Sequence, residues 1–303
     1  MKKLIVNADD FGWSDSVNRG IIAGHQNGIV SSTSVMVNMP GFEGAVDLAR
    51  ANPALGVGLH LNLVRGRAAA APERIPSLVD REGFFRRSAT ALLRDLWGRR
   101  VSPLEIAREW RAQAERLLKA GIRPTHLDSE KHLHALPGLA PILVELGRAI
   151  GVPAFRRVSF ERLTPRVLLW RSSYKMIGLA TGTALGLALV GRAGIRPLRA
   201  PDRTVGLTAA GHLTVGELLR ILRRVASGIS ELVVHPGLVD QECREISAHC
   251  GGAFIDAHRE GELQTLTDPL VSAACRERGI QLVDFGALTE EADRASVPPA
   301  PGR

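Results

Sequence analysis

Seven short apolar runs, separated by longer amphipathic segments, constrain the fold of this chain more than any other feature. The runs have the length and composition of strands and cover residues 3–8, 30–37, 56–62, 123–128, 154–158, 231–235 and 280–284. The segments between them have helical spacing and cover residues 15–27, 41–51, 102–120, 138–150, 214–226 and 267–278. Such alternation is typical of an α/β protein with a mostly parallel sheet, either open or closed into a barrel.

Length and composition indicate a globular protein with one main domain. Hydrophobic residues make up 45% of the 303 residues and charged residues 23%, which is ordinary for a soluble domain. We expect a single domain over residues 1–290 and a disordered tail over residues 291–303, because the last residues are rich in proline. Three scattered cysteines support neither a disulfide framework nor a cysteine zinc site, and no signal peptide is visible, so a cytoplasmic location is expected.

The chain is basic, with 39 Lys and Arg against 31 Asp and Glu and a net charge of +8. The excess charge is consistent with an anionic partner, such as a nucleic acid or a membrane surface. It is equally consistent with the heavy use of arginine in some genomes. Aromatic residues make up only 4% of the chain and are not interleaved with the basic ones, so we expect no nucleic-acid partner.

A basic segment with an apolar centre interrupts the alternation of strands and helices. Residues 156–203 contain ten basic residues and two acidic ones, and "MIGLATGTALGLALVG", residues 176–191, carries no charge. We expect a helical insert at about residues 160–205. Residues 176–191 fit a buried helix, a segment at a membrane interface or, less well because of their length, a membrane span.

Acids and histidines follow four of the predicted strands. Asp9 and Asp10 end the first apolar run in "VNADDFG", His60 ends the third, His126 the fourth, and His235 follows a later one. Active sites of parallel β/α folds form at the carboxyl ends of strands. An Asp with two His suits a divalent metal, and imidazole favours zinc or another transition metal over magnesium. One acid of the pair would then bind the metal while the other serves as a general base.

The segment "HLDSEKHLH" adds further polar candidates after the fourth strand. His126 and Asp128 share a face if the segment is extended. His132 and His134 fit ligands, substrate binders or exposed loop residues. The phosphate loop, the G-x-G-x-x-G loop and the G-x-S-x-G elbow do not occur in the sequence.

Four motifs together resemble the YdjC-type carbohydrate deacetylases over residues 3–285. They are "VNADDFG", "GLHLNL", "PTHLDSEKHLHALPG" and "HPG", in that order. The resemblance implies a TIM-barrel-like (β/α) barrel and the removal of acetyl groups from N-acetylated sugars with one divalent metal ion, zinc or magnesium. It implies the metal ligands Asp10, His60 and His126, the catalytic base Asp9, and the general acid His235.

The resemblance also implies substrate contacts, and this chain departs from the family's usual motif at one place. The candidate substrate-binding residues are Asn62, Asp128, His132, His134 and Arg156. The usual fourth motif has a histidine where this chain has Glu130 or Lys131, which puts in doubt a substrate role for those two positions but not the implied metal ligands.

A finer similarity concerns the "AFRRV" and "TVGLTAAGHLT" stretches, which are similar to the hopanoid-biosynthesis-associated subgroup, HpnK. The implied substrate is an N-acetylglucosaminyl hopanoid, a sugar on a membrane-embedded lipid. Residues 160–205 would then make a peripheral contact with the inner membrane face, and a homodimer is a further expectation. Deacetylation of soluble N-acetylglucosamine oligosaccharides, hydrolysis of another bond, and a non-catalytic binding role are the alternatives.

Overall fold

The structure is a computed structural model of the 303-residue chain. It describes residues 1–85, 88–136, 138–158, 198–207, 209, 211–250 and 253–289, together with residues 184 and 188. Most of the expected insert over residues 160–205, including the apolar run, lies outside the described residues, as does the expected tail over residues 291–303. The predictions for these two segments therefore stay predictions.

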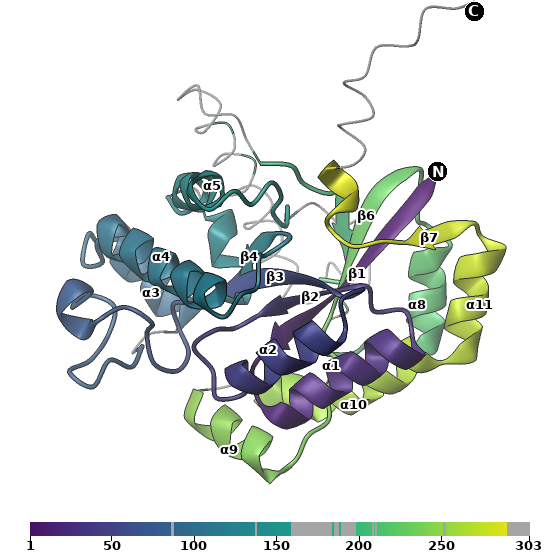
Figure 1. The fold of residues 1–303 in the computed structure, drawn as a ribbon, viewed down its shortest axis with the longest axis horizontal. Helices are drawn as coiled ribbons and strands as arrows, with labels where there is room; N and C mark the ends of the chain where they lie inside the picture. The colour runs from purple at the N-terminus through teal and green to yellow at the C-terminus, as the bar shows by residue number, and fades with distance from the viewer. Residues whose placement is uncertain are drawn as a thin grey trace, which may run out of the picture.

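A parallel sheet forms the centre of the molecule (Figure 1). Its strands are β1 (Lys2–Phe11), β2 (Ser32–Val35), β3 (Gly56–Leu61), β4 (Leu127–Ser129), β5 (Arg203–Val205), β6 (Gly228–Val234) and β7 (Ile280–Leu282). Their order is β4-β3-β2-β1-β6-β5, and β7 pairs in parallel with the beginning of β1. The central strands are almost continuously buried, as expected for strands covered on both faces.

Helices surround the sheet in Figure 1. They are α1 (Asp15–Asn27), α2 (Phe42–Ala51), α3 (Ala89–Trp97), α4 (Pro103–Lys119), α5 (Ala140–Ala149), α8 (Val215–Leu222), α9 (Gln241–Cys250), α10 (Ala253–Thr267) and α11 (Pro269–Glu277), with the short 3-10 helices η1 (Pro72–Arg74) and η2 (Glu130–Ala135). The helices α1, α2 and α10 group together, α4 lies against α5, and α8 packs against α11.

Local sequence signals explain several helix boundaries. The Ser14 side chain accepts a hydrogen bond from the Val17 N–H at the start of α1, and Thr214 forms a capping box with Glu217 at the start of α8. The helix expected over residues 102–120 is observed as α4, and Gly121 follows it with a φ of 80°. Glycine adopts this left-handed conformation without the penalty that a side chain brings.

The expected TIM-barrel-like fold is confirmed only in its coarser form, as a parallel half-barrel. The run 154–158 does not form a strand with neighbours along its length. It makes isolated parallel bridges, Leu127 with Phe155 and Ala154 with Arg199. Between β4 and β5 the described residues thus contribute single bridges rather than paired strands, and a complete eight-stranded barrel is not observed among them.

Other differences from the sequence expectations lie mostly in the second half of the chain, although the helix α3 in the first half is not among the expected segments either. The strand β5 and the helices α9 and α10 were not expected, because their sequences lack a clear apolar period. Among the described residues, none of the helices combines the length and apolar content that crossing a bilayer requires.

Candidate metal centre and active site

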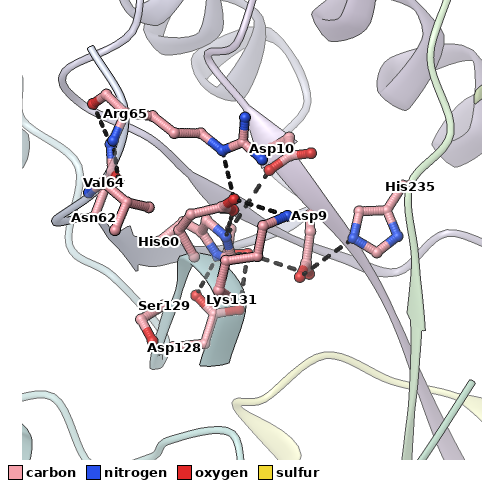
Figure 2. A network of polar contacts seen from close by, with 12 residues as sticks. Asp9, Asp10, His60, Asn62, Val64, Arg65, Asp128, Ser129, Lys131 and His235 are labelled. Carbon is pink, nitrogen blue, oxygen red and sulfur yellow. Dashed lines mark hydrogen bonds and ion pairs between the residues drawn. The ribbon is translucent and has the colours of Figure 1, made fainter. Parts of the chain in front are cut away.

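The carboxyl ends of β1, β3, β4 and β6 bring five of the sequence candidates together (Figure 2). His60 on β3 lies directly opposite Asp128 on β4 in the strand register. Asp9 and Asp10 come from the end of β1, and His235 immediately follows β6, the neighbour of β1. The parallel direction of the strands therefore gathers residues that are far apart in the sequence.

A bulge at the end of β1 turns two consecutive acids toward the same cluster. Side chains alternate along a strand, so Asn7 and Asp9 share one face. Asp10 would normally point to the opposite face, but its φ is 71°, and the register with β2 shifts between Ala8 and Phe11. Asp is one of the few residues other than glycine that tolerate this conformation, and the resulting bulge re-aims the Asp10 side chain.

Arg156 holds Asp9 in a buried, two-pronged ion pair. Its Nη1 and Nη2 donate to the two Asp9 carboxylate oxygens at 2.7 and 2.6 Å. Burial alone would raise the pKa of Asp9, but the charge and hydrogen bonds of Arg156 outweigh burial and lower that pKa to about 2. Asp9 is therefore ionised at any ordinary pH.

The same guanidinium group also binds two further carboxylates. Its Nη1 lies 2.9 Å from Asp128 Oδ2, and its Nε donates to Glu231 Oε1 at 2.6 Å. The Arg156 side chain has no exposed surface, so the structure places this candidate substrate binder beneath the site, where it orients acids. Glu231 is buried so deeply that its pKa rises to about 7 although Arg156 opposes the rise.

His60 lies between two sets of carboxylates, with one ring nitrogen facing each set. Its Nδ1 is 2.9 Å from Asp128 Oδ1, while its Nε2 is 3.5 Å from Glu130 Oε2 and 3.9 Å from Asp10 Oδ1. Burial opposes protonation of His60, but the Asp128 carboxylate and its other acidic neighbours outweigh burial and hold the pKa of His60 well above its usual value.

In the described part of the chain, two overlapping groups of side chains have the spacing of metal ligands: Asp9, His60 and Asp128, and Asp10, His60 and Glu130. Both groups already have cationic neighbours, since Arg156 binds both carboxylates of the first group and Arg259 and Arg65 each bind one carboxylate of the second, so the choice between them rests on His60. In the second group, His60 would coordinate through Nε2 while its Nδ1 faces Asp128. A carboxylate behind the free nitrogen is the usual support of a metal-bound histidine. The geometry therefore favours the second group.

The charges of the surrounding network also fit a divalent cation. Its carboxylates are Asp9, Asp10, Asp128, Glu130, Glu231 and Asp256, and its cations are Arg65, Lys131, Arg156 and Arg259. Six carboxylates face four arginine and lysine cations. In the absence of a metal, a proton on His60 and partial protonation of Glu231, both favoured by their raised pKa values, offset the difference. Buried charge is costly unless it is paired, and a divalent ion bound by neutral His60 would provide the counter-charge in place of the His60 proton.

Two arginines that the sequence analysis did not single out hold the acids of the second group. Arg259 on α10 donates to Asp10 Oδ2 at 2.7 Å, and Arg65 donates to Glu130 Oε1 at 2.6 Å. Both guanidinium groups lie near the Trp13 ring, at 5.2 Å for Arg65 and 5.8 Å for Arg259. No local sequence pattern marks these arginines, because their partners are distant in the chain.

Glu130, and not His126, is the residue of the fourth motif that lies beside His60 and Asp10. His126 comes two residues before Asp128, which places it about 7 Å further from the carboxyl end of the strand. There it stacks on Phe285 with ring centroids 3.6 Å apart, and burial lowers its pKa to about 3. The signal for Glu130 was present in the sequence, since it is one of the two positions where the motif departs from its histidine-rich form.

Gly58 makes room for this deeply placed histidine, because a Cβ at residue 58 would collide with the His126 imidazole. We expect Gly58→Ala to destabilise the protein by about 1–3 kcal/mol, the usual cost of overpacking a rigid core. Gly216, within α8, has open space where a Cβ would lie, so Gly216→Ala should instead stabilise by about 0.5–1 kcal/mol. Urea unfolding of both variants measures this, and equal effects would contradict the packing of His126 against β3.

The remaining candidates have local structural partners. The Asn62 side chain accepts the N–H groups of Val64 and Arg65 and donates to the Arg65 carbonyl. His134 is paired through Nδ1 with Ser129 and through Nε2 with the Arg156 carbonyl. Both side chains are buried, so they shape the loops of the site.

His132 differs from Asn62 and His134 in the hydrogen bonding of its side chain. Its φ is 54°, in the left-handed region, and within the described part of the chain its buried Nδ1 has no hydrogen-bond partner.

His235 borders the site on the side of Asp9, as Figure 2 shows. Its Nε2 lies 3.9 Å from Asp9 Oδ2, and its side chain is 15% exposed, more than the acids around it. The Glu262 carboxylate accepts its backbone N–H at 2.6 Å and fixes the loop after β6. The cluster thus offers an ionised acid, an accessible imidazole and a cation site side by side, which suits general acid and base catalysis.

Comparisons with known proteins show what this chain is similar to. A family model described as "YdjC-like protein" matches residues 3–277. A carbohydrate deacetylase of Brevibacillus brevis is 34% identical over 287 residues, which cover 94% of this chain and 99% of that protein. One from Vibrio cholerae is 33% identical and covers 94% and 96%. The crystal structure of a putative cellobiose-phosphate cleavage protein from Enterococcus faecalis is 28% identical, with a TM-score of 0.72 over 95% of this chain and 98% of that one.

Proposed function

This chain belongs to the YdjC-like family, and we propose that it removes the N-acetyl group from an N-acetylated amino sugar with the help of one divalent metal ion. The observation that carries the proposal is the placement of Asp9 and His235, 3.9 Å apart, beside the Asp10, His60 and Glu130 group. The curated relatives described above are named carbohydrate deacetylases, which supports hydrolysis of a linear amide bond.

Asp10, His60 and Glu130 would hold the metal. When bound, such an ion polarises the acetyl carbonyl and stabilises the negative charge that develops on its oxygen. Two oxygen donors and one nitrogen suit magnesium or manganese as well as zinc. The proposed ligand set therefore replaces His126, which the family resemblance implied, with Glu130.

Asp9 acts as the general base and His235 as the general acid. Arg156 keeps Asp9 ionised and aimed, so that it can accept a proton from the attacking water. The partly exposed His235 imidazole, when protonated, donates to the nitrogen of the leaving amine. The products are acetate and a free amino sugar, with the base acting on the attacking water before the acid protonates the leaving amine.

The proposed substrate in the cell is an N-acetylglucosaminyl hopanoid glycolipid. Its support is the similarity of the "AFRRV" and "TVGLTAAGHLT" stretches to the hopanoid-associated subgroup, together with the apolar and basic run in residues 160–205. On this proposal the enzyme works in the cytoplasm at the inner membrane face, where residues 160–205 contact the bilayer. The second candidate is a deacetylase of soluble N-acetylglucosamine oligosaccharides, which is compatible with relatives named carbohydrate deacetylases.

Two experiments test the reaction and the substrate. Acetate release from soluble N-acetylglucosamine oligosaccharides and from the glycolipid tests the reaction, and release of phosphate or reducing sugar instead would reject deacetylation. Mass spectrometry of lipids from a cell that lacks the gene tests the substrate. Accumulation of an acetylated glycolipid supports the hopanoid proposal, and an unchanged lipid profile with retained activity on soluble oligosaccharides supports the second candidate.

The proposed ligand set can be tested by comparing metal binding after the same substitution, to Gln, at Glu130 and at His126. We expect Glu130→Gln to lose most of the bound metal, because Gln lacks the charge that a divalent cation needs. His126→Gln should keep the metal and lose mainly stability. Elemental analysis and isothermal titration with Mg²⁺, Mn²⁺ and Zn²⁺ measure occupancy and affinity. Metal loss in His126→Gln with full occupancy in Glu130→Gln would restore His126 as the ligand.

A further inference from the structure

The last turn of α3 presents a large aromatic side chain to solvent. Trp97 is 76% exposed, whereas Leu92 and Asp95 of the same helix are buried. Residues Thr90, Arg94 and Trp97 are all exposed and follow one helix face at spacings of four and three. The exposed stretch continues through Gly98, Arg99 and Arg100 beyond the end of the helix.

Asp95 fixes this stretch in place. Its carbonyl accepts the backbone N–H groups of Arg100 and Val101 at 2.8 and 3.3 Å. Its carboxylate lies 3.3 Å from Arg94 Nε and 3.4 Å from Arg100 Nη1. Arg99 adopts a left-handed φ of 56° between them. Trp97 therefore projects from a backbone that is hydrogen-bonded into a tight turn.

We propose that the α3 tip, formed by Arg94, Trp97, Arg99 and Arg100, docks onto the surface of an anionic lipid bilayer. The inference is independent of the proposed reaction and concerns residues outside the segment 160–205. Figure 1 shows α3 beside α4, on the opposite side of the picture from α8 and α11. The connection that carries it leaves the sheet after β3, the strand of His60.

The chemistry of the α3 tip matches a lipid headgroup layer. Trp is enriched at the level of the headgroups, where its ring meets both apolar and polar surroundings. Arg94 and Arg100 both lie against the Asp95 carboxylate, and their side chains are 70% and 69% exposed. Residues 94–100 contain three arginines and one acid, so the α3 tip has an excess of positive charge that attracts an anionic bilayer.

The arrangement suits a membrane better than a single-stranded nucleic acid. Binding of single strands uses several aromatic rings on which successive bases stack. The α3 tip contains one aromatic ring, with its basic groups around it. Long arginine side chains can also lay their apolar stems along the acyl boundary while keeping the charge in the headgroup layer.

Vesicle co-sedimentation with the full chain tests the proposal. The vesicles contain phosphatidylcholine alone or phosphatidylcholine mixed with phosphatidylglycerol. We expect binding to the anionic vesicles that weakens as salt is raised. Trp97→Ala and the triple variant Arg94→Gln, Arg99→Gln, Arg100→Gln should each lower the partition coefficient, the triple variant by about tenfold or more.

Matched controls come from the other side of the molecule. Leu270 on α11 is 62% exposed, so Leu270→Ala removes an exposed apolar side chain elsewhere. The exposed residues Arg220, Arg223 and Arg224 at the end of α8 provide a triple Gln variant with the same change in net charge. Both controls should bind vesicles as the unchanged protein does.

Three outcomes would overturn the proposal. These are no vesicle binding by the unchanged protein, undiminished binding by both tip variants, and an equal loss in the α8 control triple, which would indicate net charge alone. Binding of DNA through the α3 tip without vesicle binding would assign this surface to nucleic acid instead. Acetate release from a soluble N-acetylated sugar should be unchanged in the tip variants, so failure of the docking proposal is distinguishable from failure of the proposed reaction.

Discussion

Replacement of Asp9 by Asn is expected to reduce turnover by about 10²–10⁴-fold while the metal stays bound. The amide keeps the size of the carboxylate, but it cannot accept a proton from water at the position facing His235. The metal is expected to stay because Asp9 does not belong to the Asp10, His60 and Glu130 group. Acetate release under saturating substrate, together with elemental analysis of the purified variant, measures both effects.

Two neighbouring acids provide the controls for Asp9→Asn. Asp10→Asn should lose the metal, since it removes a proposed ligand. Asp128→Asn should weaken metal binding by about 10–100-fold, because Asp128 supports His60 from behind without touching the ion. If Asp9→Asn emptied the site and Asp10→Asn did not, the metal would belong to the Asp9, His60 and Asp128 group instead.

Replacement of Arg156 by Met is expected to lower the free energy of unfolding by about 3–5 kcal/mol, the cost of leaving buried charges without their partner. Arg156 has no exposed surface and binds Asp9, Asp128 and Glu231. Arg156→Lys keeps the positive charge but lacks the planar guanidinium group, so it should lower the free energy of unfolding by less than Arg156→Met does. Urea unfolding at neutral pH measures the difference, and a loss below about 1 kcal/mol in the Met variant would contradict the assigned role.

The effect of Arg156→Met should depend on pH in a defined direction. Arg156 lowers the pKa of Asp9 from 3.8 to about 2, and it lowers the pKa of Asp128 in the same direction. The stability that these ionised acids contribute is fully present at pH values above the pKa that the same carboxyl groups have in the unfolded chain. It is lost as the pH falls from about 4 toward 2. The deficit of the variant should therefore shrink over that acid range.

The strand-end residues show how far sequence reasoning could go. The apolar run before Asp9 and the runs before His60 and His235 predict strands, and parallel strands end at one edge of a sheet. Proximity of these three residues therefore followed from pattern alone. The roles within the acid pair did not follow, because alternation along β1 would have turned Asp10 away from Asp9. Only the bulge and the left-handed φ of Asp10 bring both side chains to one cluster.

Arg65 and Arg259 mark the limit of local reasoning. Arg259 binds Asp10 across 249 positions and Arg65 binds Glu130 across 65. Contacts of this kind arise from the packing of α10 and of the loop after β3, and neither arginine occurs in a pattern that separates it from exposed arginines. Arg156 was noticed in the sequence as a substrate binder, but its burial beneath the acids could be seen only after the chain was folded.

By itself, the sequence determined the parallel β/α organisation, the edge of the sheet that carries the polar residues, and the family to which the chain belongs. These follow from hydrophobic periodicity and from short motifs, which are local properties. The tertiary structure decided that the sheet is a half-barrel, that Glu130 rather than His126 faces Asp10 and His60, and that Arg156 organises the acids from below. Those outcomes depend on strand register, on one bulge and on buried charge pairs between distant residues, and no local pattern encodes them.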